Sequence, residues 1–184
     1  MPSGKIILLN GPSSAGKSTL ARRLQELVPA PFWHYGLDQL RDPEVLPWER
    51  IKQGEFRWQE LRPQVHEGYH RSLVAFAGAG NNLIVDYIVE TRQVMERLVE
   101  LLTGLDVFFV GVHCALPELE RREIARGDRR RGEAHADFQT THTLCSYDLE
   151  IDSTTGAVDQ MAAAVLSGWT ARRPPSAFER MRGG

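Results

Sequence analysis

The sequence has few cysteines, no marked excess of either charge and no long apolar run. Its two cysteines, Cys114 and Cys145, lie far apart and match neither a zinc-ligand spacing nor a disulfide framework. We therefore expect a reducing compartment, the cytoplasm. The 184 residues include 24 acidic and 22 basic side chains, a formal net charge of -2. Because nucleic-acid-binding domains usually carry a basic surface, we expect no nucleic acid as a partner.

No stretch of the sequence is long and apolar enough to cross a membrane, so we expect no membrane partner either. The apolar run at residues 6–9 leads directly into a glycine-rich segment and is too short for the apolar region of a signal peptide. A content of 42% hydrophobic and 25% charged residues is typical of a globular domain. The length fits one domain with a single core.

Short strand-like runs alternate with longer helical patterns along the chain. Runs that are apolar on both faces are typical of buried parallel strands. They occupy residues 5–10, 82–88, 106–114 and 148–152, with a weaker run at 32–37. Helical patterns occupy residues 18–27, 61–77, 92–102, 117–125 and 158–169. This alternation predicts an α/β domain with a parallel sheet and helices on both of its faces.

Residues 11–18, Gly-Pro-Ser-Ser-Ala-Gly-Lys-Ser, match the phosphate-loop pattern G-x-x-x-x-G-K-[ST] in full. The segment lies between a predicted strand and a predicted helix, the context in which backbone N–H groups and the helix N-terminus bind phosphate. Lys17 is expected to reach the β- and γ-phosphates, and Ser18 to coordinate Mg²⁺. The predicted phosphate-binding residues are Gly11, Pro12, Ser13, Ser14, Ala15, Gly16, Lys17, Ser18 and Thr19.

Two aspartates lie at or just after the ends of predicted strands, at the edge of the sheet where α/β proteins bind ligands. Asp86 ends the run Leu-Ile-Val-Asp and is a candidate to hold Mg²⁺, directly or through water; its alternative role is to cap a turn. Asp38 follows Tyr-Gly-Leu and is a candidate to take the proton of an acceptor hydroxyl. On local grounds Asp38 is equally suited to cap the segment that follows.

The segment at residues 126–137 is rich in charge, interrupted by glycine and poor in apolar residues. We expect a mobile surface loop here. Its arginines, Arg126, Arg129, Arg130 and Arg131, could close over a triphosphate as a lid, neutralise transferring charge and exclude water. The alternative is a solvated run of charge. Residues 171–184, with two prolines and several arginines, are expected to form a flexible C-terminal tail.

His66, Glu67 and His70 match the zinc pattern H-E-x-x-H. No third ligand follows at the spacing of the known zinc families, and Gly68 weakens a helix at this point. The apolar stripe of the predicted helix leaves both histidines on its flank. We therefore expect no zinc site, and a quieter role for these side chains is to line an acceptor pocket.

With these residues established, the chain resembles the chloramphenicol phosphotransferase family of P-loop small-molecule kinases, which are similar in structure to shikimate and adenylate kinases. The matching segments are residues 6–18, 35–38, 83–86, 106–114, 122–129 and 147–155. The stretches R-E-x-A-R-G-D-R and Y-D-x-E-x-D-[ST]-T are more particular than the phosphate loop. Three features depart from the family: Pro12, the C-terminal extension, and the segment 40–60, which contains Trp48.

The resemblance implies roles that the residues alone leave open. It implies that Asp38 is the base that activates the acceptor, and that Arg122, Arg126 and Arg129 belong to a lid that contacts the nucleotide. It also implies that residues 152–155 lie near the adenine and that the nucleotide is ATP rather than GTP. Because the segment 40–60 departs from the family, chloramphenicol does not follow as the acceptor.

The sequence thus predicts one P-loop NTPase domain at residues 1–170, with a five-stranded parallel sheet in the order 2-3-1-4-5. The expected reaction is transfer of the γ-phosphoryl group of ATP, with Mg²⁺, to a small hydroxylated molecule, as in antibiotic inactivation. The catalytic residues would be Lys17, Asp38, Arg126 and Arg129. A kinase of a sugar, a shikimate-like metabolite or a nucleotide precursor is an alternative, as is a nucleotide-dependent switch. The oligomeric state, including a homo-oligomer, stays open.

Overall fold

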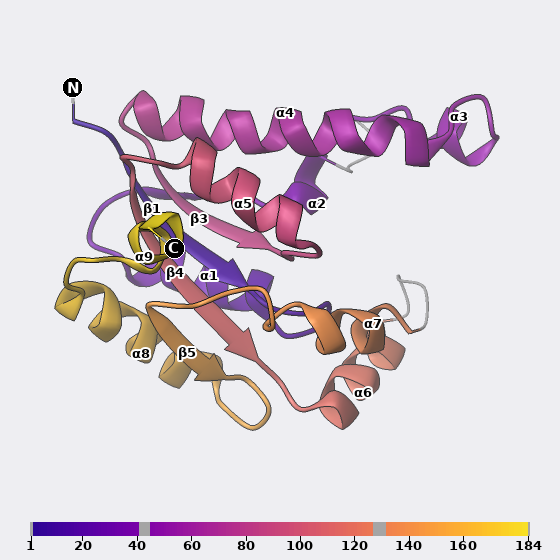
Figure 1. The fold of residues 1–184 in the computed structure, drawn as a ribbon. Helices are drawn as coiled ribbons and strands as arrows, with labels where there is room; N and C mark the ends of the chain where they lie inside the picture. Colours follow the sequence, from indigo (N-terminus) through magenta and orange to yellow (C-terminus); the bar gives the residue numbers. More distant parts are fainter. Residues whose placement is uncertain (1, 41–44, 127–131, 184) are drawn as a thin grey trace.

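The computed structural model describes residues 2–40, 45–126 and 132–183, which form a three-layered α/β domain (Figure 1). Every pairing in its five-stranded sheet is parallel, and the order is β2-β3-β1-β4-β5, as predicted. The strands are β1 (Lys5–Asn10), β2 (Phe32–His34), β3 (Asn82–Tyr87), β4 (Asp106–His113) and β5 (Leu149–Asp152). Because β1 lies between β3 and β4, the residues after β1 are at the centre of the sheet edge.

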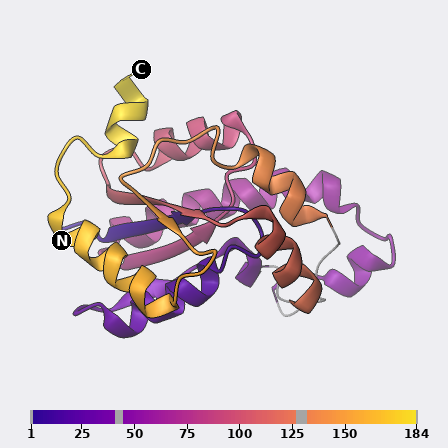
Figure 2. The same ribbon diagram turned by 90° about the horizontal axis from the view of Figure 1, so that it is seen from below.

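Helices cover both faces of the sheet. The helices of the described residues are α1 (Lys17–Leu27), α2 (Leu37–Leu40), α3 (Trp48–Lys52), α4 (Trp58–Gly78), α5 (Arg92–Leu101), α6 (Leu116–Arg126), α7 (Glu133–Thr140), α8 (Val158–Ala171) and α9 (Ala177–Gly183). Seen from below, α1 lies beside α8 and α6 lies beside α7 (Figure 2). Among the described residues, no helix combines the length and apolar character needed to cross a bilayer.

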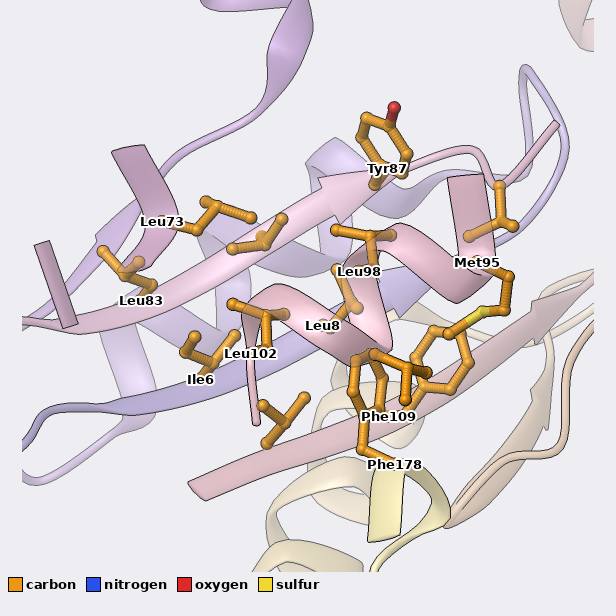
Figure 3. Packing of buried hydrophobic residues seen from close by; sticks show 14 of the residues in the cluster. Ile6, Leu8, Leu73, Leu83, Tyr87, Met95, Leu98, Leu102, Phe109 and Phe178 are labelled. Atoms are coloured by element: carbon orange, nitrogen blue, oxygen red, sulfur yellow. The ribbon is translucent and has the colours of Figure 1, made fainter. Parts of the chain in front are cut away.

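The alternation of side chains along β1 divides the core into two parts. Ile6 and Leu8 point to the face covered by α4, α5 and α9, where they pack with residues such as Leu73, Leu98 and Phe109 (Figure 3). Ile7 and Leu9 point to the other face and pack under α1, α6 and α8. All four β1 side chains are fully buried, which explains why the run is apolar on both faces.

The C-terminal segment corrects a prediction. Residues 177–183 form α9 rather than a flexible tail, and Phe178 packs edge to face on Phe109 with ring centroids 5.2 Å apart. The Asp148 carboxylate accepts a 2.6 Å hydrogen bond from the backbone N–H of Ala177 and fixes the start of the helix. The arginines and prolines around one buried aromatic residue obscured this anchor in the sequence.

The expected lid is also more ordered than predicted where it is described. Residues 133–137 begin α7, and Ala134 is fully buried. Glu123, itself buried on α6, accepts hydrogen bonds from the N–H groups of Gly132 and Ala134, at 2.8 and 2.9 Å. A loop was expected because the segment has few apolar residues, but a buried carboxylate supplies the partner for the helix N-terminus. Arg129, Arg130 and Arg131 lie outside the described residues.

Candidate active site

A cleft of about 760 Å³ opens at the carboxyl edge of the sheet, lined by residues of α4 on one side and of α6 and α7 on the other. The predicted residues that line it are Ser13, Ser14, Gly16, Lys17, Ser18, Thr19, Asp38, Asp86, Arg122 and Arg126. Gly11, Pro12 and Ala15 lie beneath the loop surface and are buried. The structure therefore brings the phosphate loop, both candidate aspartates and two of the candidate arginines to one cavity.

The phosphate loop turns sharply where β1 passes into α1. Gly16 has φ = 85°, a conformation that favours glycine, and Ser14 has φ = 65°. The Lys17 ammonium donates hydrogen bonds to the carbonyls of Gly11 and Pro12, both at 2.8 Å, so the side chain folds over its own loop. Pro12 has no N–H, so it offers no backbone donor to a phosphate, and its carbonyl holds Lys17 instead.

Asp86 and Ser18 meet across the sheet edge. The Ser18 hydroxyl donates to Oδ2 of Asp86 at 2.5 Å, and Nε2 of His34 lies 3.3 Å from the same oxygen. Gly36 leaves room for the carboxylate, since a Cβ there would lie 1.9 Å from Oδ1. Burial raises the pKa of Asp86, but contacts with His34 and Ser18 and the charge of Lys17 outweigh this and hold the pKa below its usual value.

The Ser18–Asp86 pair fits a magnesium site of the P-loop type. A hydroxyl and a carboxylate are hard oxygen donors, and Mg²⁺ is usually held by one or two such groups together with phosphate oxygens and water. The described residues contain no cluster of three or more histidine, cysteine, aspartate or glutamate side chains that could hold a metal by themselves. A cation held by this pair would need further ligands, such as phosphate oxygens and water.

Asp38 lines the cleft from α2, whereas Arg122 and Arg126 line it from α6. Asp38 is in the first turn of the short helix α2, exposed to solvent. Gln39 braces the turn around it: its side chain donates to the His34 carbonyl and accepts from the Gly36 N–H, both at 3.2 Å. Asp38 thus lines the cleft from the first turn of α2.

The arginine side of the cleft is built by α6 and α7. Arg122 of α6 donates to the Glu118 carboxylate at 2.6 Å and to the Ser153 carbonyl at 2.7 Å. Its side chain therefore connects α6 to the loop after β5. Arg126 lines the cleft one turn further along α6. Asp137 on α7 accepts a 3.0 Å hydrogen bond from the Ser13 N–H. Sequence reasoning missed this contact, since no motif links α7 to the phosphate loop.

The remaining wall of the cleft is the half expected to receive an acceptor. It is lined by Leu37, Trp58, Arg62, His66, Tyr87, Ile88 and Glu90. The Trp58 ring packs against Trp48, with centroids 5.0 Å apart, and Arg62 pairs with Glu90. This half of the cleft therefore presents an aromatic surface, and the opposite charges of Arg62 and Glu90 neutralise each other. Both tryptophans belong to the segment in which the sequence departs from the family.

The two histidines of the H-E-x-x-H pattern contact Tyr87. The Tyr87 hydroxyl lies 2.9 Å from Nε2 of His70 and 3.3 Å from Nδ1 of His66. Glu67 instead pairs with Arg97 and Arg71, whose hydrogen bonds lower its pKa to about 2. His66 lines the cleft, whereas His70 is buried.

Comparisons with known proteins agree with this fold. Residues 4–170 match the model of the chloramphenicol phosphotransferase-like protein family. A protein of Mycobacterium tuberculosis (strain H37Rv), provisionally named an O-phosphotransferase, is 33% identical over 201 residues, which cover 99% of this chain and 89% of that protein.

Solved structures of P-loop kinases share the fold at low sequence identity. The Mycobacterium tuberculosis APS kinase, solved with AMPPNP and APS, has a TM-score of 0.69 at 17% identity and covers 93% of this chain and 100% of its own. The Acinetobacter baumannii shikimate kinase, solved with shikimate, has a TM-score of 0.63 at 18% identity, covering 93% and 96%. A tunicamycin resistance protein of Deinococcus radiodurans also reaches 0.63 at 18% identity, covering 94% and 100%.

The sheet order and the phosphate loop define a protein with the P-loop kinase fold. Within that class, the chain belongs to the chloramphenicol phosphotransferase-like family.

Proposed function

We propose that this protein transfers the γ-phosphoryl group of ATP, with Mg²⁺, to a hydroxyl group of a small molecule. The observation that carries the proposal is the single cleft in which Lys17, the Ser18–Asp86 pair and Asp38 meet beside an acceptor half lined by Trp58. A nucleotide-dependent switch would need the phosphate loop but no acceptor pocket, whereas a kinase needs both. Family membership and the name of the mycobacterial relative support the same reaction class.

The phosphate side of the cleft would bind and neutralise the triphosphate. Lys17 would leave the loop carbonyls to bind the β- and γ-phosphates, while the loop N–H groups bind the remaining oxygens. Ser18 and Asp86 would hold Mg²⁺, which supplies charge neutralisation at the phosphates. Arg122 and Arg126 approach from α6, where guanidinium groups can stabilise charge that moves to the leaving oxygen. Arg129 is proposed for the same role from the sequence alone.

The acceptor side would supply the nucleophile. The Asp38 carboxylate accepts the proton of the acceptor hydroxyl, whose oxygen forms a bond to the γ-phosphorus. The bond between that phosphorus and the β–γ bridging oxygen breaks, and ADP leaves with the electron pair. The Trp58 ring offers a face for the body of the acceptor.

The acceptor is proposed as a chloramphenicol-like antibiotic or another small hydroxylated metabolite. A coupled assay of ADP release, with Mg²⁺-ATP and a panel of antibiotics, sugars and shikimate-like acids, tests this directly. The expected result is one compound that stimulates ADP release and gains a phosphate, detected by mass spectrometry. A rise of the same size in an Asp38→Asn variant, or no stimulation by any compound, would count against the proposal.

A further inference from the structure

Three neighbouring residues, Ser18, His34 and Gly36, restrain the Asp86 carboxylate. Oδ2 accepts the Ser18 hydroxyl at 2.5 Å and lies 3.3 Å from Nε2 of His34. Oδ1 fills the space that the absent side chain of Gly36 leaves. The carboxylate is therefore restrained at both oxygens, and the side chain is only 12% exposed.

No sequence motif predicts that His34 contacts Asp86. His34 is the last residue of β2, and its partner across the sheet is Ile84, two residues before Asp86 on β3. Its Nε2 is buried and, within the described part of the chain, makes no hydrogen bond of full geometry; the carboxylate that it faces is Asp86. A buried polar atom without a hydrogen-bond partner destabilises the folded state, and Asp86 is the group placed to offset this.

We propose that His34 is a positioning residue for the divalent-cation site, which it controls by orienting the Asp86 carboxylate toward Ser18. The inference rests on the proposed nucleotide-dependent function. A hydroxyl that coordinates a cation does so through a lone pair and must direct its proton to another acceptor. Asp86 Oδ2 is that acceptor for Ser18. His34 does not line the cleft, so it acts through Asp86 and does not touch the phosphates.

Burial and charge at Asp86 agree with this role. Removing a carboxylate from water favours its protonated form, which binds cations poorly. Burial accordingly raises the pKa of Asp86, and the contact with His34 is the largest influence that lowers it, followed by Ser18 and Lys17. The contacts with Ser18 and His34 hold the carboxylate in one orientation. Partners that orient metal-binding groups in this way commonly change metal affinity 10- to 100-fold when they are removed.

Two variants distinguish the effect of the His34 hydrogen-bond donor from the effect of its side-chain volume. His34→Gln keeps a donor on a side chain of similar reach, whereas His34→Leu fills the space without one. The readout is Mn²⁺ binding measured by electron paramagnetic resonance in the presence of AMPPNP, so no acceptor is needed. We expect Mn²⁺ affinity to fall about 10-fold or more in His34→Leu and to stay close to wild type in His34→Gln.

His113→Leu is the matched control. His113 also ends a strand and pairs with a carboxylate, Glu150, at 2.7 Å, but neither residue lines the cleft. This variant should bind Mn²⁺ as the wild type does. In an Asp86→Asn background, His34→Leu should cause no further loss, because a residue that acts through Asp86 has no effect once that carboxylate is gone.

Wild-type Mn²⁺ affinity in His34→Leu would overturn the proposal. Equal losses in the Leu and Gln variants, together with a lower Tm in both, would also overturn it and assign His34 to packing. A wild type that binds Mn²⁺ and AMPPNP but phosphorylates no acceptor would contradict only the phosphotransferase function. A wild type that binds no Mn²⁺ with AMPPNP would contradict both.

Discussion

Lys17 and Asp38 lie on different walls of the same cleft and carry different parts of the proposed reaction. The phosphate-loop pattern placed Lys17 without help from the fold, because the motif specifies a local backbone conformation. Asp38 was ambiguous in the sequence, because a strand-end aspartate can cap a helix as readily as it can serve a site. His34 and Asp137 were not predicted, since each acts through a contact between residues distant in sequence.

Lys17→Ala should largely abolish phosphoryl transfer. No other lysine follows the loop at the required spacing, so the β- and γ-phosphates would lose their cation. Isothermal titration with AMPPNP and Mg²⁺ should show weaker binding in parallel. Lys52→Ala, which removes an exposed lysine on α3, is the control and should behave as wild type. Normal turnover in Lys17→Ala would refute the phosphate-loop assignment.

Asp38→Asn should separate catalysis from capping. Asparagine keeps the shape and the capping ability of aspartate but cannot take a proton at neutral pH. We expect kcat to fall about 10²- to 10⁴-fold, with Tm and nucleotide affinity close to wild type. If turnover is retained while Tm falls, the role of Asp38 is structural, and Asp86 becomes the next residue to test as the base.

His70 should make the fold less stable in acid. Burial lowers its pKa to about 4, with a smaller contribution from His66, while the unfolded value is near 6.5. The folded state therefore favours the neutral ring, and this stabilisation is present above pH 6.5 and is lost as pH falls toward 4. The loss is on the order of 3 kcal/mol. Urea denaturation measures the free energy of unfolding at pH 7 and at pH 4.5. Its decrease between these two pH values should be smaller in His70→Gln than in the wild type. An identical decrease in both proteins would contradict the role of His70.

The elements differ in how well local sequence predicted them. The strands and the helices α1, α4, α5, α6 and α8 were predicted to within a few residues. The central strands are apolar on both faces, and each of these helices buries an apolar face. By contrast, α7 and α9 have little apolar surface and depend on tertiary contacts. Glu123 caps α7 from a neighbouring helix, and Asp148 together with Phe109 holds α9. Such partners leave no periodic pattern in the helix that they stabilise.

Arg126, at the end of α6, should affect turnover more than binding of the acceptor. A lid arginine meets charge chiefly as the β–γ bond breaks, so Arg126→Ala should lower kcat on the order of 10³-fold or more. The acceptor KM should change little. Arg121→Ala is the matched control, because Arg121 lies on the same helix but is exposed and pairs with Glu118 outside the cleft lining. Equal kcat values in Arg126→Ala and Arg121→Ala would contradict a role for Arg126 in the reaction.

At the scale of the whole molecule, the central position of β1 connects the core to the site. Its side chains fill the core on both faces, and its last residue, Asn10, is fully buried just before the phosphate loop. The Asn10 side chain accepts from the Val89 N–H at 2.9 Å and donates to the Tyr147 hydroxyl at 2.8 Å. The loop is thus anchored to the segments that follow β3 and precede β5. The sequence predicted the strand but not these polar anchors.

The C-terminal helix should stabilise the whole domain without taking part in the reaction. Phe178 is 6% exposed, packs on Phe109 and does not line the cleft. Phe178→Ala should cost about 3 kcal/mol of unfolding free energy, within the range for a buried phenylalanine. Below the Tm of the variant, nucleotide affinity and kcat should match wild type. Arg182→Ala, an exposed change on the same helix, serves as the control for thermal and urea unfolding. An unchanged Tm in Phe178→Ala would instead favour a flexible tail, because Phe178 would then contribute nothing to the stability of the core.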